Sequence, residues 1–191
     1  MIGPFRYEDG AYRARLEPPY STLIARLMEE ILVVLDDPGE MPSFVAAATQ
    51  METSREAPEE RALGYLLPSM SLDEEDASGL RALTEDFLRA EKSSRLRKVG
   101  ASVERSELHG LEEIEIPVED VWEWLAALND VRLGLAGELG LETDEDVARI
   151  EEAAQAAPKG TREQSASAIY LVLTWWQDSL LAALNSAGGP N

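Results

Sequence analysis

The chain has 191 residues, 45% of them hydrophobic, which suffices for one sizeable core and predicts a single domain over residues 1–191. Its 17 basic and 37 acidic residues give a formal net charge of -20, which disfavours nucleic acid and anionic membranes as partners and favours proteins with basic surfaces. The absence of cysteine excludes disulfides, thiolate metal sites and thiol redox switches.

The N-terminus carries no pattern of a secretory signal. No window of the chain approaches ~18 uninterrupted apolar residues, the length that a membrane-spanning helix requires. We therefore expect a cytoplasmic protein with no membrane partner.

The first segment, "FRYEDGAYRARL", predicts a β-hairpin within residues 1–16. Apolar and polar residues alternate around Asp9-Gly10, a dipeptide that tolerates the positive φ angles of a tight turn. A two-residue loop at this dipeptide would pair Tyr7 with Tyr12. Because an isolated hairpin is only marginally stable, it must pack on another element.

The rest of the chain predicts a mainly α fold, a single-domain helical bundle. Pro18-Pro19 precede an apolar stripe at helical spacing, which predicts a helix over residues 20–36. Residues 38–60, which contain proline, serine, threonine and glutamate, predict a mobile loop in which "FVAAATQM" would form a short helix. Residues 74–185 predict the main helical bundle. The helices expected after the loop are 59–67, 74–105, 118–139, 144–156 and 162–185.

Three local patterns add detail to this bundle. The alternation in "EEIEIP" places Ile114 and Ile116 on one face and predicts a short third strand beside the hairpin. Gly140 is typical of a helix C-terminus. The last helix is apolar on most of its circumference, which predicts that it runs through the centre of the core.

One charged residue lies on the apolar stripe of the predicted helix 118–139. Arg132 stands among leucines, with Asn129 one turn earlier, and a lone buried guanidinium is strongly unfavourable. We predict that Glu85 or Asp86 of a neighbouring helix pairs with it. Two interpretations stand: a structural polar clamp that fixes the register of two helices, or an open site for a ligand carboxylate or phosphate. The residues of this clamp or site are Thr84, Glu85, Asp86, Asn129, Asp130 and Arg132.

The segment "RAEKSSRLRKVGASVER" holds a local excess of basic residues. It is either a solvated helix face or a surface that contacts the phosphates of DNA. The residues concerned are Arg89, Lys92, Arg95, Arg97, Lys98 and Arg105.

Four tryptophans form two pairs in predicted helices. Members of a pair point in different directions, since a helix turns by about 100° per residue. Core packing and a protein interface are the two interpretations of these tryptophans, with one member of each pair as the candidate for the interface. The residues are Trp122, Trp124, Trp175 and Trp176.

The motifs of common enzymes and metal proteins are missing. His109 is the only histidine, so neither a metalloprotease motif nor a di-iron bundle can form, and no nucleophile elbow accompanies it. The acidic runs at 73–76 and 142–146 precede predicted helices, where negative charge stabilises the helix dipole. We expect no catalytic residue, no metal and no cofactor.

Several segments, taken in chain order, resemble the actinobacterial oxidative-stress regulator family AosR, formerly catalogued as a domain of unknown function. They are "FRYEDGAYRARL", "LLPSM", "LTEDFLRAEKSSRLRKV", "WLAALNDVRLGLAGELGL" and "YLVLTWWQDSLLAAL", and the resemblance covers nearly the whole chain. It implies a cytoplasmic, transcription-associated regulator without enzymatic activity. Redox sensing by a cysteine pair cannot carry over to this chain.

Three functions remain open on these grounds. The first is a regulator that binds a basic protein partner, such as part of the transcription machinery, as a monomer or homodimer. The second is direct DNA binding through the segment Arg89–Arg105. The third is a small-ligand binder or enzyme at Arg132.

Overall fold

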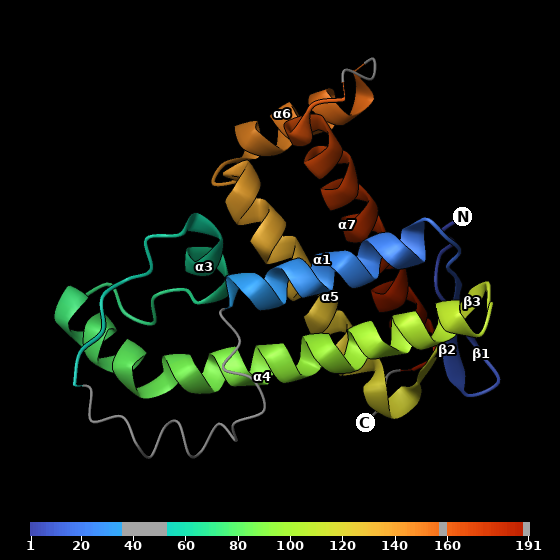
Figure 1. Cartoon of the computed structure of the whole chain (residues 1–191), viewed down its shortest axis with the longest axis horizontal. Coiled ribbons are helices and arrows are strands. Elements are labelled where there is room, and N and C mark those ends of the chain that lie inside the picture. Colours follow the sequence, from blue (N-terminus) through green and yellow to red (C-terminus); the bar gives the residue numbers. More distant parts are fainter. Residues whose placement is uncertain (36–52, 157–159, 189–191) are drawn as a thin grey trace.

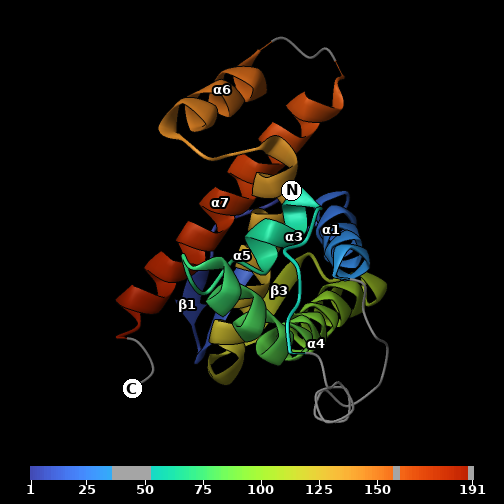
Figure 2. The same cartoon turned by 90° about the vertical axis from the view of Figure 1, so that its left-hand side faces the viewer.

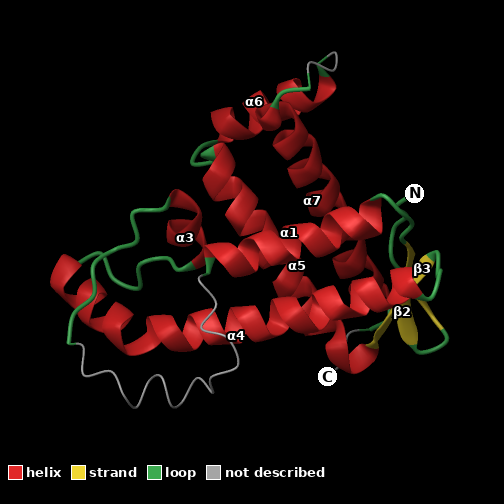
Figure 3. Ribbon diagram, in the orientation of Figure 1, coloured by secondary structure: helices red, strands yellow, loops and turns green. Residues whose placement is uncertain are grey.

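The structure is a computed structural model that describes residues 1–35, 53–156 and 160–188 (Figure 1). The described helices are α1 (Tyr20–Val34), α3 (Arg61–Leu66), α4 (Glu74–Leu108), α5 (Val121–Leu139), α6 (Asp144–Gln155) and α7 (Arg162–Ser186), with a short 3-10 helix, η1 (Val118–Asp120), before α5. The strands are β1 (Arg6–Glu8), β2 (Ala11–Arg15) and β3 (Glu113–Pro117). The predicted mainly α fold with an N-terminal hairpin and a third strand is confirmed (Figure 3).

The three strands form one antiparallel sheet in the order β1-β2-β3. Tyr7 pairs with Tyr12 across the hairpin, as predicted, and Tyr12 pairs with Ile116 on its other side. Asp9 and Gly10 both have positive φ angles, of 52° and 80°, which is the backbone of a tight two-residue hairpin turn. The turn chemistry and the alternation therefore set the register that the sequence predicts.

The hairpin is anchored to the C-terminal helix through Trp176. This side chain is fully buried and lies against Phe5, with 4.8 Å between ring centroids. The indole Nε1 of Trp176 donates a hydrogen bond to the carbonyl of Gly3, and the backbone N–H of Phe5 donates to Ser179 Oγ. The sheet thus acquires the packing partner that a hairpin needs.

The helix at the centre of the bundle is α5, and the expectation that the last helix occupies this place is wrong. α5 packs against α1, α3, α4 and α7, and its residues are mostly buried. α7 lies along one side of α5, so Trp175 and Leu181 remain 45% and 38% exposed. A helix that is apolar all round has a surplus apolar face when only part of its circumference is covered.

α1 and α4 lie side by side and antiparallel across α5 (Figure 1). At one end of the pair, Thr22 Oγ1 of α1 donates to a Glu107 carboxylate oxygen of α4. At the other end, Arg89 of α4 donates to the carbonyl of Leu35, which caps α1. α4 ends three residues later than expected, at Leu108, and a turn at His109-Gly110 leads the chain back to β3.

The structure describes only part of the predicted mobile loop. Its residues 38–52, including the short helix expected at "FVAAATQM", lie outside the described residues. In the described part, Arg55 is tied to α4: its backbone N–H donates to Ser78 Oγ and its guanidinium donates to Asp86. This part of the segment follows a defined path along α4.

Two glycines let other helices approach α5 closely. A Cβ at Gly137 would lie 2.6 Å from Ala62 Cα in the backbone of α3. A Cβ at Gly134 would lie 2.2 Å from Ile31 Cδ1, the end of a side chain of α1. Backbone cannot withdraw as a side-chain terminus can, so position 137 is the stricter of the two.

We predict that Gly137→Ala lowers the free energy of unfolding by about 1–2 kcal/mol, since overpacking outweighs the gain in helix propensity. Gly134→Ala, the matched control, changes it by less than about 1 kcal/mol because Ile31 can repack. Denaturant unfolding of both variants measures the difference. Equal stability of the two would contradict this account of α3 docking.

Candidate functional site: the polar contacts of α5 and the groove beside it

Arg132 is held by neutral groups of α7. Its Nε donates to Thr174 Oγ1 at 3.1 Å and its Nη1 donates to Gln177 Oε1 at 2.6 Å. The guanidinium also lies 5.6 Å from the centre of the Tyr170 ring, within the range of a cation–π interaction. Gln177 in turn donates to the carbonyl of Leu125, so the contact joins α5 to α7 twice.

The predicted pairing of Arg132 with Glu85 or Asp86 is therefore wrong. Asn129, expected to complete the hydrogen bonds of Arg132, is half-buried and is not among the groups that hold the guanidinium. The reason is angular: α4 lies on the opposite side of α5 from α7. Positions 130 and 132 point about 200° apart on a helix, so Asp130 faces α4 where Arg132 cannot.

Asp130 is the acid that joins α5 to α4. It is 2% exposed and forms ion pairs with Lys92 and with Arg95, the latter at 2.9 Å from Asp130 Oδ2 to Arg95 Nη1. Both cations come from the basic segment of α4. The sequence therefore identified the right two helices for a polar contact. It predicted the base on α5 and the acid on α4, whereas the acid lies on α5 and the bases lie on α4.

Two further members of the basic segment are also paired. Arg89 donates to Glu85 Oε1 through Nε and Nη2, at 2.9 and 2.8 Å. Lys98 bonds to Asp120 and Glu123 at the start of α5, and these bonds raise the pKa of the Lys98 ammonium. Arg97 and Arg105 are exposed on α4. Most of the basic residues are thus directed at acids of this same chain.

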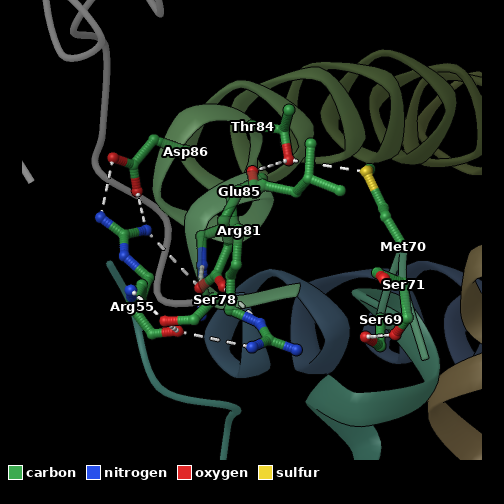
Figure 4. A network of polar contacts seen from close by, with 11 residues as sticks. Arg55, Ser69, Met70, Ser71, Ser78, Arg81, Thr84, Glu85 and Asp86 are labelled. Carbon is green, nitrogen blue, oxygen red and sulfur yellow. Dashed lines mark hydrogen bonds and ion pairs between the residues drawn. The ribbon is translucent and has the colours of Figure 1, made fainter. Parts of the chain in front are cut away.

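Glu85 and Asp86 belong to a cluster on the first half of α4 (Figure 4). Asp86 accepts two hydrogen bonds from the guanidinium of Arg55, at 2.7 and 3.1 Å. Glu85 is 5% exposed, and Arg81 Nε lies 3.6 Å from its Oε2. Thr84 donates to the Leu80 carbonyl and also contacts Met70 Sδ at 3.8 Å. This cluster fastens the chain on either side of α3 onto α4.

The cavity beside Glu85 is small. It measures about 10 Å³ and is lined by Met70, Arg81 and Glu85 among others. This volume is of the order of one water molecule, so it holds no organic substrate. Within the described ranges, no group of three or more His, Asp or Glu side chains is arranged to hold a metal ion.

The tryptophans divide as the helical geometry predicts. Trp124 and Trp176 are buried and meet edge to face, with ring centroids 6.5 Å apart. Trp122 and Trp175 are 58% and 45% exposed. Trp124 and Trp176 therefore belong to the core, whereas Trp122 and Trp175 stay a candidate interface.

A groove that the sequence analysis did not predict runs between α1, α3 and α5. Its volume is about 520 Å³, and Leu27, Ile31 and Val34 of α1 form one wall. Figure 2 looks toward this end of the molecule, where α3 lies beside α1. The sequence signal that points to it is the pair Gly134 and Gly137, because small residues three apart on a helix mark close approach of neighbours.

The chain matches the family described as Domain of unknown function (DUF2017) over residues 2–184. The chain belongs to this family. No curated protein and no solved structure matches it. Among the described residues of this DUF2017 member, no helix has the length and apolar character needed to cross a membrane.

We predict that Asp130→Ala lowers the free energy of unfolding by about 3 kcal/mol, because Lys92 and Arg95 lose a buried counter-charge. Glu91→Ala is the matched control: Glu91 also pairs with Arg95, but its side chain is 51% exposed, so its loss costs less than about 0.5 kcal/mol. Chemical denaturation measures both. A loss below about 1 kcal/mol for Asp130→Ala would contradict its place as the joint between α4 and α5.

A double-mutant cycle tests the partner of Arg132. We expect a coupling of about 1–2 kcal/mol between Arg132→Met and Gln177→Leu. Either substitution alone removes the same hydrogen bond to the charged guanidinium, so the second one adds no further loss of that bond. Coupling between Arg132→Met and Asp86→Asn is expected to be near zero. A larger coupling with Asp86→Asn than with Gln177→Leu would show that Arg132 pairs with α4 and not with α7.

Proposed function

We propose that this chain is a cytoplasmic, non-enzymatic regulator associated with transcription and stress, and that it acts by binding another protein. The resemblance to the oxidative-stress regulators supplies the link to transcription. The family description assigns no activity, so the mode of action is inferred from the charge of the chain and from its internal contacts.

One observation carries this proposal: the basic segment of α4 is turned toward acids of the same chain. Asp130 forms ion pairs with Lys92 and Arg95, and Lys98 forms ion pairs with Asp120 and Glu123. Phosphate contacts would have to compete with these ion pairs and with a net charge of -20. A protein partner with a basic surface meets neither obstacle.

The contacts of Arg132 favour the same conclusion over a ligand site. Its guanidinium is occupied by Thr174 and Gln177, and the cavity at Glu85 is of the size of a single water. These observations support structural contacts, in place of ligand binding, as the role of Arg132 and Glu85.

Affinity capture with the full chain tests the proposal. We expect at least one basic protein to be retained from a lysate of the source organism at low ionic strength and released at high ionic strength, because the attraction is between exposed charges. Direct titration of the purified partner then measures affinity and stoichiometry. No retained protein at low ionic strength would contradict the proposal.

A DNA mobility shift tests the alternative. We expect no shift of duplex DNA by the wild-type chain at low salt. A shift that disappears in the double variant Arg97→Ala and Arg105→Ala would establish DNA binding in place of protein binding, since both residues are exposed on α4.

A further inference from the structure

The groove between α1, α3 and α5 is apolar along its floor and walls. The apolar residues that line it are Leu27, Ile31 and Val34 of α1, Val131 and Leu135 of α5, and Ala62 of α3. Gly134 and Gly137 also line it, and at these two positions Ile31 of α1 and the backbone of α3 lie close to α5. Its volume of about 520 Å³ is of the order of a binding site, not of a packing defect.

A second, separate cavity lies further along α1. It measures about 190 Å³, shares Leu27 with the groove and extends past Leu23 to Tyr20, against Ile169 and Val172 of α7. The α1 residues that line one cavity or the other lie between Tyr20 and Val34, over the 15 residues of the helix, a length of about 22 Å. A partner helix of about four turns that lies along α1 would place its apolar stripe over both cavities.

The charges at the rim of the groove are not balanced. Its two arginines are already paired, Arg61 with Glu142 and Arg162 with Glu138, each at 2.7 Å. Glu30 of α1 and Glu60, which caps α3, are exposed, and within the described part of the chain neither takes part in an ion pair. Uncompensated negative charge therefore lies on two separate walls.

We infer that this groove binds a basic amphipathic helix of a partner protein, whose apolar stripe lies against α1 and α5 and whose lysines or arginines meet Glu30 and Glu60. The inference rests on the proposed function and names its surface. A second copy of this chain is the weaker occupant, because two molecules of charge -20 repel each other. An acidic or neutral helix would leave both carboxylates without a partner.

The probe for the test is a synthetic helix of leucine and lysine with leucines at helical spacing, and its matched control is the same helix with glutamate in place of lysine. Because the chain has no cysteine, a single Val33→Cys substitution allows a polarity-sensitive dye to be placed at the groove. Val33 lines the groove and is 79% exposed. Leu108→Cys, at the far end of α4 and 86% exposed, carries the control dye.

We expect saturable binding of the leucine–lysine helix, seen by the dye at position 33 and not by the dye at position 108. The double variant Glu30→Gln and Glu60→Gln should weaken binding about fivefold or more at low salt, since each exposed charge pair contributes a fraction of a kcal/mol to about 1 kcal/mol. The double variant Glu29→Gln and Glu59→Gln removes the same charge next to the groove and should change binding less than about twofold.

Three results would overturn the inference: equal weakening by the two double variants, equal response of the two dyes, or binding of the leucine–glutamate helix. Sedimentation of the wild-type chain adds a fourth, dimerisation that Glu30→Gln and Glu60→Gln strengthen, which would make a second copy the occupant.

The same variants separate this inference from the proposed function. A captured partner that is lost with Glu30→Gln and Glu60→Gln, and kept with Glu29→Gln and Glu59→Gln, supports both. A partner that both double variants retain leaves the proposed function standing and refutes the groove as its site. Failure to capture any protein refutes the proposed function, while the peptide titration still reports on the groove.

Discussion

The buried carboxylate of Asp130 is the constraint on which the arrangement of the bundle depends. It joins the central helix α5 to the long helix α4 through Lys92 and Arg95, and it is 2% exposed. Buried ion pairs add little net stability compared with apolar packing, but they penalise any register that separates them. The pair therefore fixes how α4 lies on α5, and with it the place of α1 and of the sheet at the end of α4.

Arg132 performs the same task on the opposite side of α5. Its bonds to Thr174 and Gln177 set the position of α7, whose Trp176 then anchors the hairpin through Phe5 and Gly3. Two polar contacts on opposite faces of one helix thus hold α4 and α7 in register with α5. Such use of charge inside the fold leaves the outer surface strongly acidic, and this surface is what a partner meets.

The groove follows from the same arrangement. α5 needs glycine at 137 because the backbone of α3 approaches there, and glycine at 134 leaves the space in which Ile31 lies. The close approach brings the end of α1 and the start of α3 to the same stretch of α5, with Glu30 and Glu60 at its rim. The proposed binding surface therefore lies beside the close contacts at Gly134 and Gly137, while the polar contacts of Asp130 and Arg132 serve the fold.

The sequence by itself determined the local structure. Asp9-Gly10 dictated the hairpin turn, apolar periodicity dictated the helices, and Gly140 ended α5, because each of these depends on neighbours in the chain. Only the tertiary structure decided which side chains meet. Asp130 and Arg132 are two positions apart, and their opposite directions matter only once α4 and α7 take their places on either side. The central position of α5 and the groove beside it depend on contacts between distant segments, which periodicity does not encode.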